Sequence, residues 1–433
     1  MFITYVSQAP EVCAAHRYLL VYIGTGAVRP WAYRAAKARG SKGLSGLGPF
    51  RWRIVAVAAV ILVLIGGGAW FALARDTAQG ATNGTASHQA AAKPKVVAAK
   101  PETVVSVTPS AHTRGVNGAG AIRVVFSSPL ASGSPMPSVT PSIPGRWQQL
   151  NSTTVQFVPR QGFAENTHVK ISVPAGASGV RSTAGGELTK TFVSRFWTGA
   201  YSTMRLEQLL ARLGYLPLTW SPAPGSAAVP AKHPNAQLSA AYDPPSGTFT
   251  WNSSGWPEAL QSMWQPGETG SILSGAVMAF ENNQALDMDG VAGPQVWKAL
   301  LHAVAKGQNN PNGYTYAYVS EGSPETLTIW HNGQEVEHTL ANTGIPGRAT
   351  ALGTYPVYLK YQHQIMKGTN PDGKKYADPV SWVSYFNGSD AVHYYPRASY
   401  GFPQSLGCVE LPNAQAEQSY PYLTYGSLVT VAG

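Results

Sequence analysis

The chain has little cysteine and little charge for its length. Only two of its 433 residues are cysteines, Cys13 and Cys408, which excludes a disulfide scaffold and the multi-cysteine zinc folds. Charged residues make up 12%, about half the usual share of soluble proteins. Hydrophobic residues reach 44%, enough for buried cores, so the chain is not disordered throughout. Its 45 glycines and 33 prolines indicate a mainly β, turn-rich protein.

The formal net charge of +10 is concentrated at the N-terminus. Eight basic residues and one acid, Glu11, precede residue 54, and the remainder of the chain has a net charge of only +3. A nucleic-acid-binding domain would carry clustered basic residues of its own. We therefore expect no nucleic-acid partner.

The basic cluster is followed by a run without charge, Ile54 to Leu73. About 20 apolar residues can cross a ~30 Å hydrocarbon core as a helix, and basic flanks stay on the cytoplasmic side. We predict a cytoplasmic basic tail (1–50), a transmembrane helix (51–74) through the lipid bilayer and a flexible extracellular linker (75–102). The alternatives are a buried helix of a soluble domain and a signal peptide cleaved near the Gly-Gly-Gly-Ala run.

Residues 103–198 consist of short alternating runs separated by turn residues. In one of them, Ile122, Val124 and Phe126 would share one face of a strand. The strand rhythm and the ending Phe157–Pro159 resemble bacterial immunoglobulin-like modules. The resemblance implies an Ig-like β-sandwich, and we expect it to act as a spacer.

Residues 199–308 show helical spacing at both ends. Four leucines fall on one helical stripe that ends at Gly214: Leu206, Leu209, Leu210 and Leu213. The patterns LxxLGYLP and AVMAFExxxxLxxDGVAGPxVWxAL resemble the peptidoglycan-binding domain, which is built from three short helices. An insertion at about 218–268 departs from that pattern.

Residues 312–433 return to alternating β patterns. Asn332–Gly333 predicts a two-residue hairpin turn, and Asn413 is an acceptable N-cap for one helix. Ser405-Leu406-Gly407-Cys408 follows His393 by a loop that can bring the two ends together.

Cys408 is the candidate nucleophile, because Cys13 lies in the predicted cytoplasmic tail and a lone extracellular thiol has no partner. A neighbouring imidazole can raise the thiolate population of such a cysteine. Gly407 permits a tight turn, so the N–H groups of Gly407 and Cys408 could face an oxyanion. A packed small side chain and a surface imidazole remain the alternative for this pair.

This C-terminal region resembles the L,D-transpeptidase catalytic domain of the YkuD type. The matching features are His393 before a loop, the Ser405–Val409 run, a final Gly426–Val429 strand and an upstream Asn-Thr-Gly segment. The resemblance implies that Cys408 is the nucleophile and His393 the general base, with Tyr394 supplying a backbone carbonyl beside the base. It also implies substrate or oxyanion roles for four further residues: Ser405, Leu406, Gly407 and Tyr376. It calls for no metal and no organic cofactor.

Two positions depart from the family pattern. Leu406 replaces a second histidine, and Glu410 stands where a basic or polar residue often follows. Loss of the imidazole removes a hydrogen-bonding group next to the nucleophile. A catalytically impaired peptidoglycan-binding scaffold is therefore the alternative to an active enzyme.

The resemblance implies an acyltransferase of the cell wall. Cys408 would form a thioester on a peptidoglycan tetrapeptide stem, and an amine of a neighbouring stem would take the acyl group to give a 3→3 cross-link. Water as acceptor would make the protein an L,D-carboxypeptidase instead. Carbapenem β-lactams are the expected inhibitors, and glycan strands are expected partners. A sorting-type cysteine transpeptidase fits poorly, because no arginine stands in the expected place.

Overall fold

The computed structural model describes residues 98–433. The predicted tail (1–50), transmembrane helix (51–74) and most of the linker (75–102) lie outside the described residues, so these remain predictions. The longest helices of the described part, α4 (Ser271–Asn283) and α5 (Pro294–Lys306), have 13 residues each. None of the helices in residues 98–433 is long and apolar enough to cross a bilayer.

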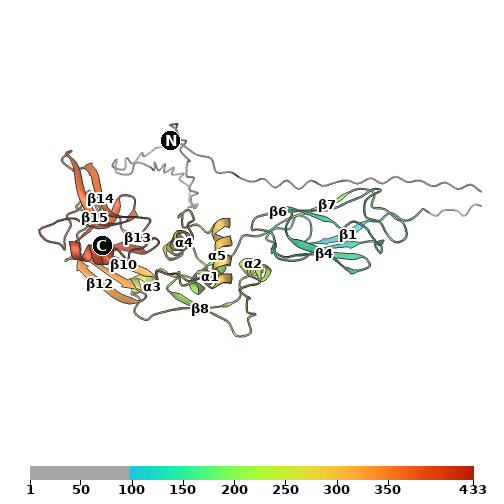
Figure 1. The fold of residues 1–433 in the computed structure, drawn as a ribbon, viewed down its shortest axis with the longest axis horizontal. Coiled ribbons are helices and arrows are strands. Elements are labelled where there is room, and N and C mark those ends of the chain that lie inside the picture. The colour runs from blue at the N-terminus through green and yellow to red at the C-terminus, as the bar shows by residue number, and fades with distance from the viewer. Residues whose placement is uncertain (1–97) are drawn as a thin grey trace, which may run out of the picture. The chain divides into compact units, whose positions relative to one another are not determined.

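The Ig-like domain is a sandwich of two antiparallel sheets (Figure 1). The sheets have the orders β1-β2-β5-β4 and β3-β6-β7. Ile122, Val124 and Phe126 are buried between them, as their alternation predicts. The side chain of Glu102, which the sequence places in the linker, is buried here and accepts hydrogen bonds from Ser127 and Ser128. The strands are β1 (Val104–Thr108), β2 (Ile122–Phe126), β3 (Ser138–Thr140), β4 (Gly145–Asn151), β5 (Thr154–Pro159), β6 (His168–Val173) and β7 (Phe192–Trp197).

The region of residues 199–308 contains the three expected helices together with an ordered insertion. Leucines of α1 (Thr203–Arg212) pack against α4 and α5 in one core, and Gly214 has a φ of 76° just after α1. The insertion forms two helices and a two-stranded antiparallel sheet. These are β8 (Leu218–Pro222), α2 (Pro234–Tyr242), β9 (Gly247–Trp251) and α3 (Glu258–Gln261).

The C-terminal domain consists of two sheets with one helix, α6 (Asn413–Ser419). The strand orders are β12-β11-β10-β18-β13 and β14-β15-β16-β17. Asn332 and Gly333 both have positive φ and join β11 to β12, as predicted for the hairpin turn. The strands are β10 (Thr315–Ser320), β11 (Thr326–His331), β12 (Gln334–Leu340), β13 (Gly353–Pro356), β14 (Leu359–Thr369), β15 (Lys375–Asn387), β16 (Asp390–Tyr394), β17 (Val409–Leu411) and β18 (Leu428–Ala432).

The central strands β10 and β18 of the five-stranded sheet are buried on both faces. Ala317 of β10 and Val429 of β18 contribute to a core with strands β16 and β17, whereas Tyr316 and Leu428 belong to the core of the helical region. Side chains alternate between the faces of a strand, so successive residues of β10 and β18 serve two different cores. The helices of residues 199–308 and the C-terminal sheet therefore share one apolar core.

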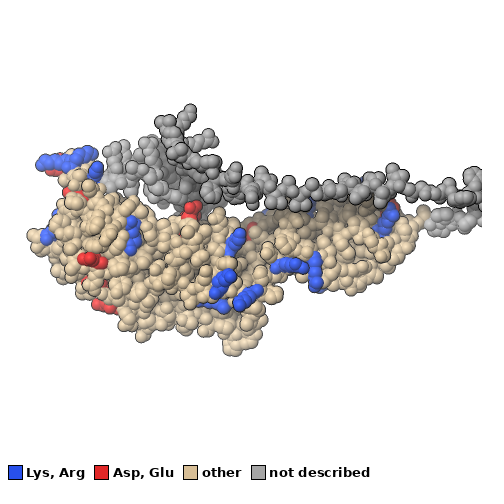
Figure 2. All heavy atoms as spheres, in the orientation of Figure 1, with Lys and Arg blue, Asp and Glu red and all other residues tan. Residues whose placement is uncertain are grey.

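Strands β14 and β15 form a long hairpin that projects from the C-terminal domain (Figure 1). Figure 2 shows basic side chains at its tip, where Lys374 pairs with Asp372, while much of the remaining visible face is uncharged. The hairpin supplies Met366, Val380 and Val383 to a small apolar cluster that packs against Cys408. The hairpin thus forms one wall beside the candidate nucleophile.

Candidate active site

Strand β16 carries His393, and Cys408 lies just before β17, on the same face of the sheet. The two strands are parallel, with Val392 opposite Val409 and His393 opposite Glu410. Val392 and Val409 both enter the core between the sheets, whereas Ala391 and Cys408 belong to the cluster under the hairpin. His393 lies two residues after Ala391, so it shares the face of Cys408.

The imidazole of His393 is held in one orientation by its own strand. The residue is only 3% exposed, and Nδ1 lies 3.0 Å from the carbonyl oxygen of Tyr394. A proton on Nδ1 donated to this carbonyl leaves Nε2 as the acceptor nitrogen. Burial lowers the pKa of His393, although the Tyr394 contact and the charge of Glu410 oppose this. The imidazole is therefore neutral near pH 7 and can serve as a base.

Cys408 is a thiol in this structure. Sγ donates a hydrogen bond to the carbonyl of Ser389 over 3.5 Å, and no hydrogen bond between Sγ and His393 occurs in residues 98–433. Burial raises the pKa of Cys408 to about 12, and the charges of Asp390 and Glu410 add to the rise, while the Ala391 N–H lowers it. The resting thiolate population is therefore small, because burial and the charges of two carboxyl groups favour the thiol.

The turn before the nucleophile is fixed by Ser405. Its hydroxyl donates to the carbonyl of Cys408 over 2.6 Å and accepts the N–H of Gly407 over 3.1 Å. Gly407 has a φ of 122°, and a Cβ there would lie 2.9 Å from Oδ1 of Asp390, so glycine is required. The Gly407 N–H is therefore already paired, contrary to its expected place in an oxyanion hole. Leu406, between these residues, is partly buried.

Tyr376 reaches the neighbourhood of Cys408 from the hairpin. It lies on β15 opposite Gly368 of β14, where any Cβ would collide with the tyrosine hydroxyl. Burial raises the pKa of Tyr376, as do the charges of Cys408 and Asp378, while Arg348 lowers it. The hydroxyl is therefore protonated at neutral pH and lies within electrostatic reach of the sulfur.

Two charged residues of the site were missed in the sequence. Asp390 accepts the N–H of Ala351 over 3.2 Å, and burial raises its pKa to about 6. Arg397 donates twice to Glu410 from within the loop that joins base and nucleophile. Asp390 has the sequence signature of an ordinary turn residue, and the spacing between Arg397 and Glu410 matches no motif, so neither could be found before the fold was known.

The other histidines of the domain do not form a metal site. His331 contacts Thr315, His338 contacts Thr328 and the exposed His363 contacts Ser381. Within residues 98–433, no three His, Cys, Asp or Glu side chains lie close enough together to hold a metal ion.

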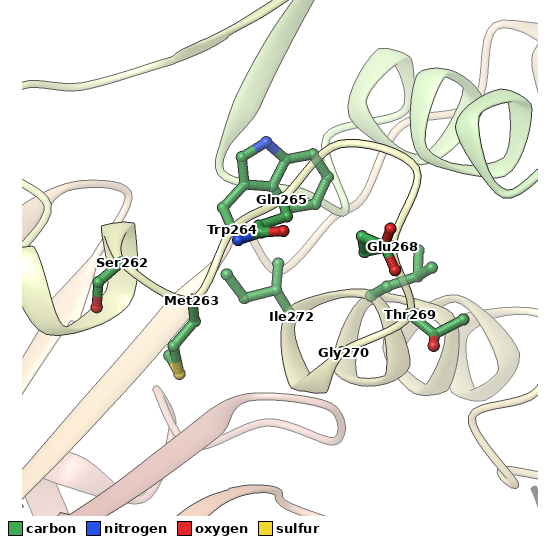
Figure 3. A pocket seen from close by; sticks show the side chains of 9 residues that line it. Ser262, Met263, Trp264, Gln265, Glu268, Thr269, Gly270 and Ile272 are labelled. Carbon is green, nitrogen blue, oxygen red and sulfur yellow. The ribbon is translucent and has the colours of Figure 1, made fainter. Parts of the chain in front are cut away.

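A pocket of about 300 Å³ lies between the loop after α3 and the start of α4 (Figure 3). Trp264 forms one side and Ile272 faces it, while Glu268 and Thr269 lie toward one end. The indole of Trp264 also contacts the ring of Phe249 edge-on at 5.4 Å. None of the residues that line this pocket belongs to the Cys408 site.

Two family models match the chain. Residues 314–431 match the L,D-transpeptidase catalytic domain, and residues 98–198 match a bacterial Ig-like domain. Residues 314–431 are an L,D-transpeptidase catalytic domain. The L,D-transpeptidase domain thus includes both His393 and Cys408, and the Ig-like sandwich predicted for residues 103–198 is confirmed.

Solved structures of L,D-transpeptidases are similar to this chain at low identity. An LD transpeptidase, LdtMt1, in complex with imipenem is 15% identical over 76% of this chain and 98% of its own, with a TM-score of 0.26. An L,D-transpeptidase from Mycobacterium smegmatis is 13% identical over 77% of this chain and 100% of its own, with a TM-score of 0.26. The catalytic domain of an E. faecium L,D-transpeptidase is 24% identical over 27% of this chain and 96% of its own, with a TM-score of 0.25. No curated protein matches the chain. The assignment of the L,D-transpeptidase domain rests on the family model.

Proposed function

We propose that the chain is a cell-wall L,D-transpeptidase that forms 3→3 peptidoglycan cross-links through a thioester on Cys408. The observation that carries this proposal is that His393 on β16 and Cys408, the residue just before the parallel strand β17, lie on the same face of the sheet within an L,D-transpeptidase domain. A buried neutral imidazole beside a partly buried thiol is the arrangement that general-base activation of a nucleophile requires.

In the first half-reaction, Sγ of Cys408 attacks the carbonyl carbon of the third residue of a tetrapeptide stem. The thiol proton passes to Nε2 of His393, and the hydrogen bond to Tyr394 stabilises the imidazolium that forms. The C–N bond then breaks, and His393 returns the proton to the departing D-alanine amine. We propose the Cys408 N–H and the Tyr376 hydroxyl as oxyanion donors, since the Gly407 N–H is paired with Ser405.

In the second half-reaction, the amine of a neighbouring stem attacks the thioester carbonyl. The amine transfers its proton to His393, the C–S bond breaks and the sulfur regains a proton. Water in place of the amine gives a carboxypeptidase reaction through the same steps. Neither route needs a metal or an organic cofactor.

The predicted transmembrane helix, linker and Ig-like domain suit this chemistry. They would anchor the L,D-transpeptidase domain at the cell membrane with a cytoplasmic N-terminus and place it outside, where the wall polymer lies. The helical region, with its pocket beside Trp264, is the part that we propose to hold glycan strands.

Acylation by a carbapenem tests the proposed nucleophile. We expect one covalent adduct by intact mass, located on the Cys408 peptide and absent from Cys408→Ala. Cys13→Ala is the control and should acylate like the wild type. An unmodified wild-type protein would argue against the enzyme.

A peptidoglycan-binding scaffold without turnover is the second candidate. It is favoured by the raised pKa of Cys408 and by the absence of a hydrogen bond to His393 in the described part of the chain.

Leu406→His distinguishes the two candidates. If the leucine marks a degenerate site, the variant should turn over tetrapeptide fragments at least tenfold faster than the wild type. A native leucine-containing site should change by less than about threefold, because the general base His393 is intact. Muropeptide analysis by mass spectrometry measures both outcomes.

A further inference from the structure

The loop between base and nucleophile, residues 394–407, is closed by an ion pair. Arg397 donates from Nε to Oε2 of Glu410 over 2.7 Å and from Nη2 to Oε1 over 2.8 Å. The side chain of Glu410 is 6% exposed and that of Arg397 is 28% exposed. Two parallel N–H···O bonds in a mostly buried site hold the two groups in one geometry, which a surface ion pair does not achieve.

The pair fastens both ends of the loop. Nη2 of Arg397 also donates to the carbonyl of Gln404 over 3.0 Å, and the guanidinium lies over the ring of Tyr395 at 4.8 Å. Behind the pair, the backbones of Asn342 and Glu410 exchange two hydrogen bonds of 2.9 Å each. Because Gln404 and Glu410 flank the Ser405–Cys408 turn, the position of the sulfur depends on this closure.

The pair also sets the charge beside the imidazole. Glu410 is the register partner of His393, and its charge raises the pKa of both His393 and Cys408. The guanidinium of Arg397 lowers the pKa of His393. The remaining charged or titratable groups that act on Cys408 or its neighbour Tyr376 are Asp390 on β16, Asp378 on β15 and Arg348 in the loop before β13.

We propose that the Arg397–Glu410 pair is a positioning element that closes the loop between His393 and Cys408 and cancels the charge beside the imidazole. The acid at position 410 is thus compensated by Arg397. The proposal rests on the proposed roles of His393 and Cys408, yet its test needs no peptidoglycan turnover.

Two variants, each of which removes one charge of the pair, test whether the pair cancels the charge beside the imidazole. In full-length Arg397→Gln, the uncompensated Glu410 should move the NMR titration of His393 to higher pH. In Glu410→Gln, the uncompensated guanidinium should move it to lower pH, with each shift about half a pH unit or more. Alkylation of Cys408 by iodoacetamide, followed on its own peptide, should require higher pH in Arg397→Gln. Shifts in the same direction, or none, would overturn the proposal.

A charge exchange tests loop closure separately. The double variant Arg397→Glu, Glu410→Arg restores an ion pair with the charges exchanged. Its melting temperature should therefore exceed those of the single variants Arg397→Glu and Glu410→Arg. The midpoint of the His393 titration should nevertheless lie at lower pH than in the wild type, because a cation then faces the imidazole. A double variant no more stable than the singles would contradict closure by the pair. The control is the exposed pair Arg181–Glu187, at 3.2 Å in the Ig-like domain, whose glutamine variants should leave the His393 titration unchanged.

Discussion

Replacing His393 by glutamine should slow acylation of Cys408 by a carbapenem about 10²–10⁴-fold, the range of a lost general base. Glutamine keeps a polar side chain of similar length but cannot take the thiol proton. The effect should be large here because burial and the charges of Asp390 and Glu410 raise the pKa of Cys408 to about 12, so little thiolate exists without a base. Stopped-flow or quench mass spectrometry measures the rate.

The pH profile gives a second signature of the same residue. Burial lowers the pKa of His393 from its ordinary value near 6.5, so the imidazole loses its basic form only below that pH. The wild-type acylation rate should therefore fall on acidification below about pH 6.5, and His393→Gln should lack this dependence. His363→Gln is the matched control, because His363 is exposed on the hairpin, and it should react within about twofold of the wild type. A wild-type-like rate for His393→Gln would exclude it as the base.

Glu281→Gln and Glu207→Gln should each raise the stability of the helical region at pH 8 by about 1–3 kcal/mol. Both carboxyl groups are buried, with one oxygen accepting a loop N–H at 2.8 Å, from Gly290 and Gly267 respectively. The other oxygen of each has no hydrogen-bond partner among residues 98–433. Burial raises the pKa of Glu281 to about 8 and that of Glu207 to about 7.

The sign follows from proton linkage. A carboxyl group whose pKa is raised by folding binds its proton more tightly in the folded state. The contribution of such a group to the free energy of unfolding is therefore fully present below the unfolded pKa near 4.5. It is lost as the pH rises toward about 7 for Glu207 and about 8 for Glu281. Glutamine mimics the protonated form, so the variants should match the wild type at pH 4 and exceed it at pH 8. Denaturant unfolding at both pH values measures this. Glu258→Gln, exposed on α3, is the control, and equal gains at both pH values would contradict a titration effect.

Local patterns predicted much of the fold. The leucine stripe of α1, the alternating face of β2 and the turn at Asn332 are properties of a few neighbouring residues, and all three are found in the structure. Strands β3, β4 and β17 and the ordered insertion were missed. The insertion is rich in Pro, Ser and Ala and shows no clear period, so its helices α2 and α3 left little signal.

The identity of the base and the nucleophile could be predicted from the sequence, but the charges around them and the protonation state of Cys408 could not. The order of His393 and Cys408 along the chain was weak evidence by itself, and the resemblance to L,D-transpeptidases was needed to name them as base and nucleophile. The protonation of Cys408 depends on Val380 and Val383 of the hairpin and on Asp390 and Glu410, which only the register of the sheet brings close. The ion pair between Arg397 and Glu410 could not be predicted either, because it too forms only once the chain is folded.

The apolar core around Tyr316 and Leu428 limits how this protein can be rearranged by recombination. The Ig-like domain has a core of its own and can be duplicated or replaced without opening the core around Tyr316 and Leu428. The helices of residues 199–308 cannot, because a catalytic segment transferred without them would carry the uncovered side of β10 and β18 into water. A descendant that changes its wall attachment is therefore expected to change the N-terminal modules and to inherit these helices together with its nucleophile.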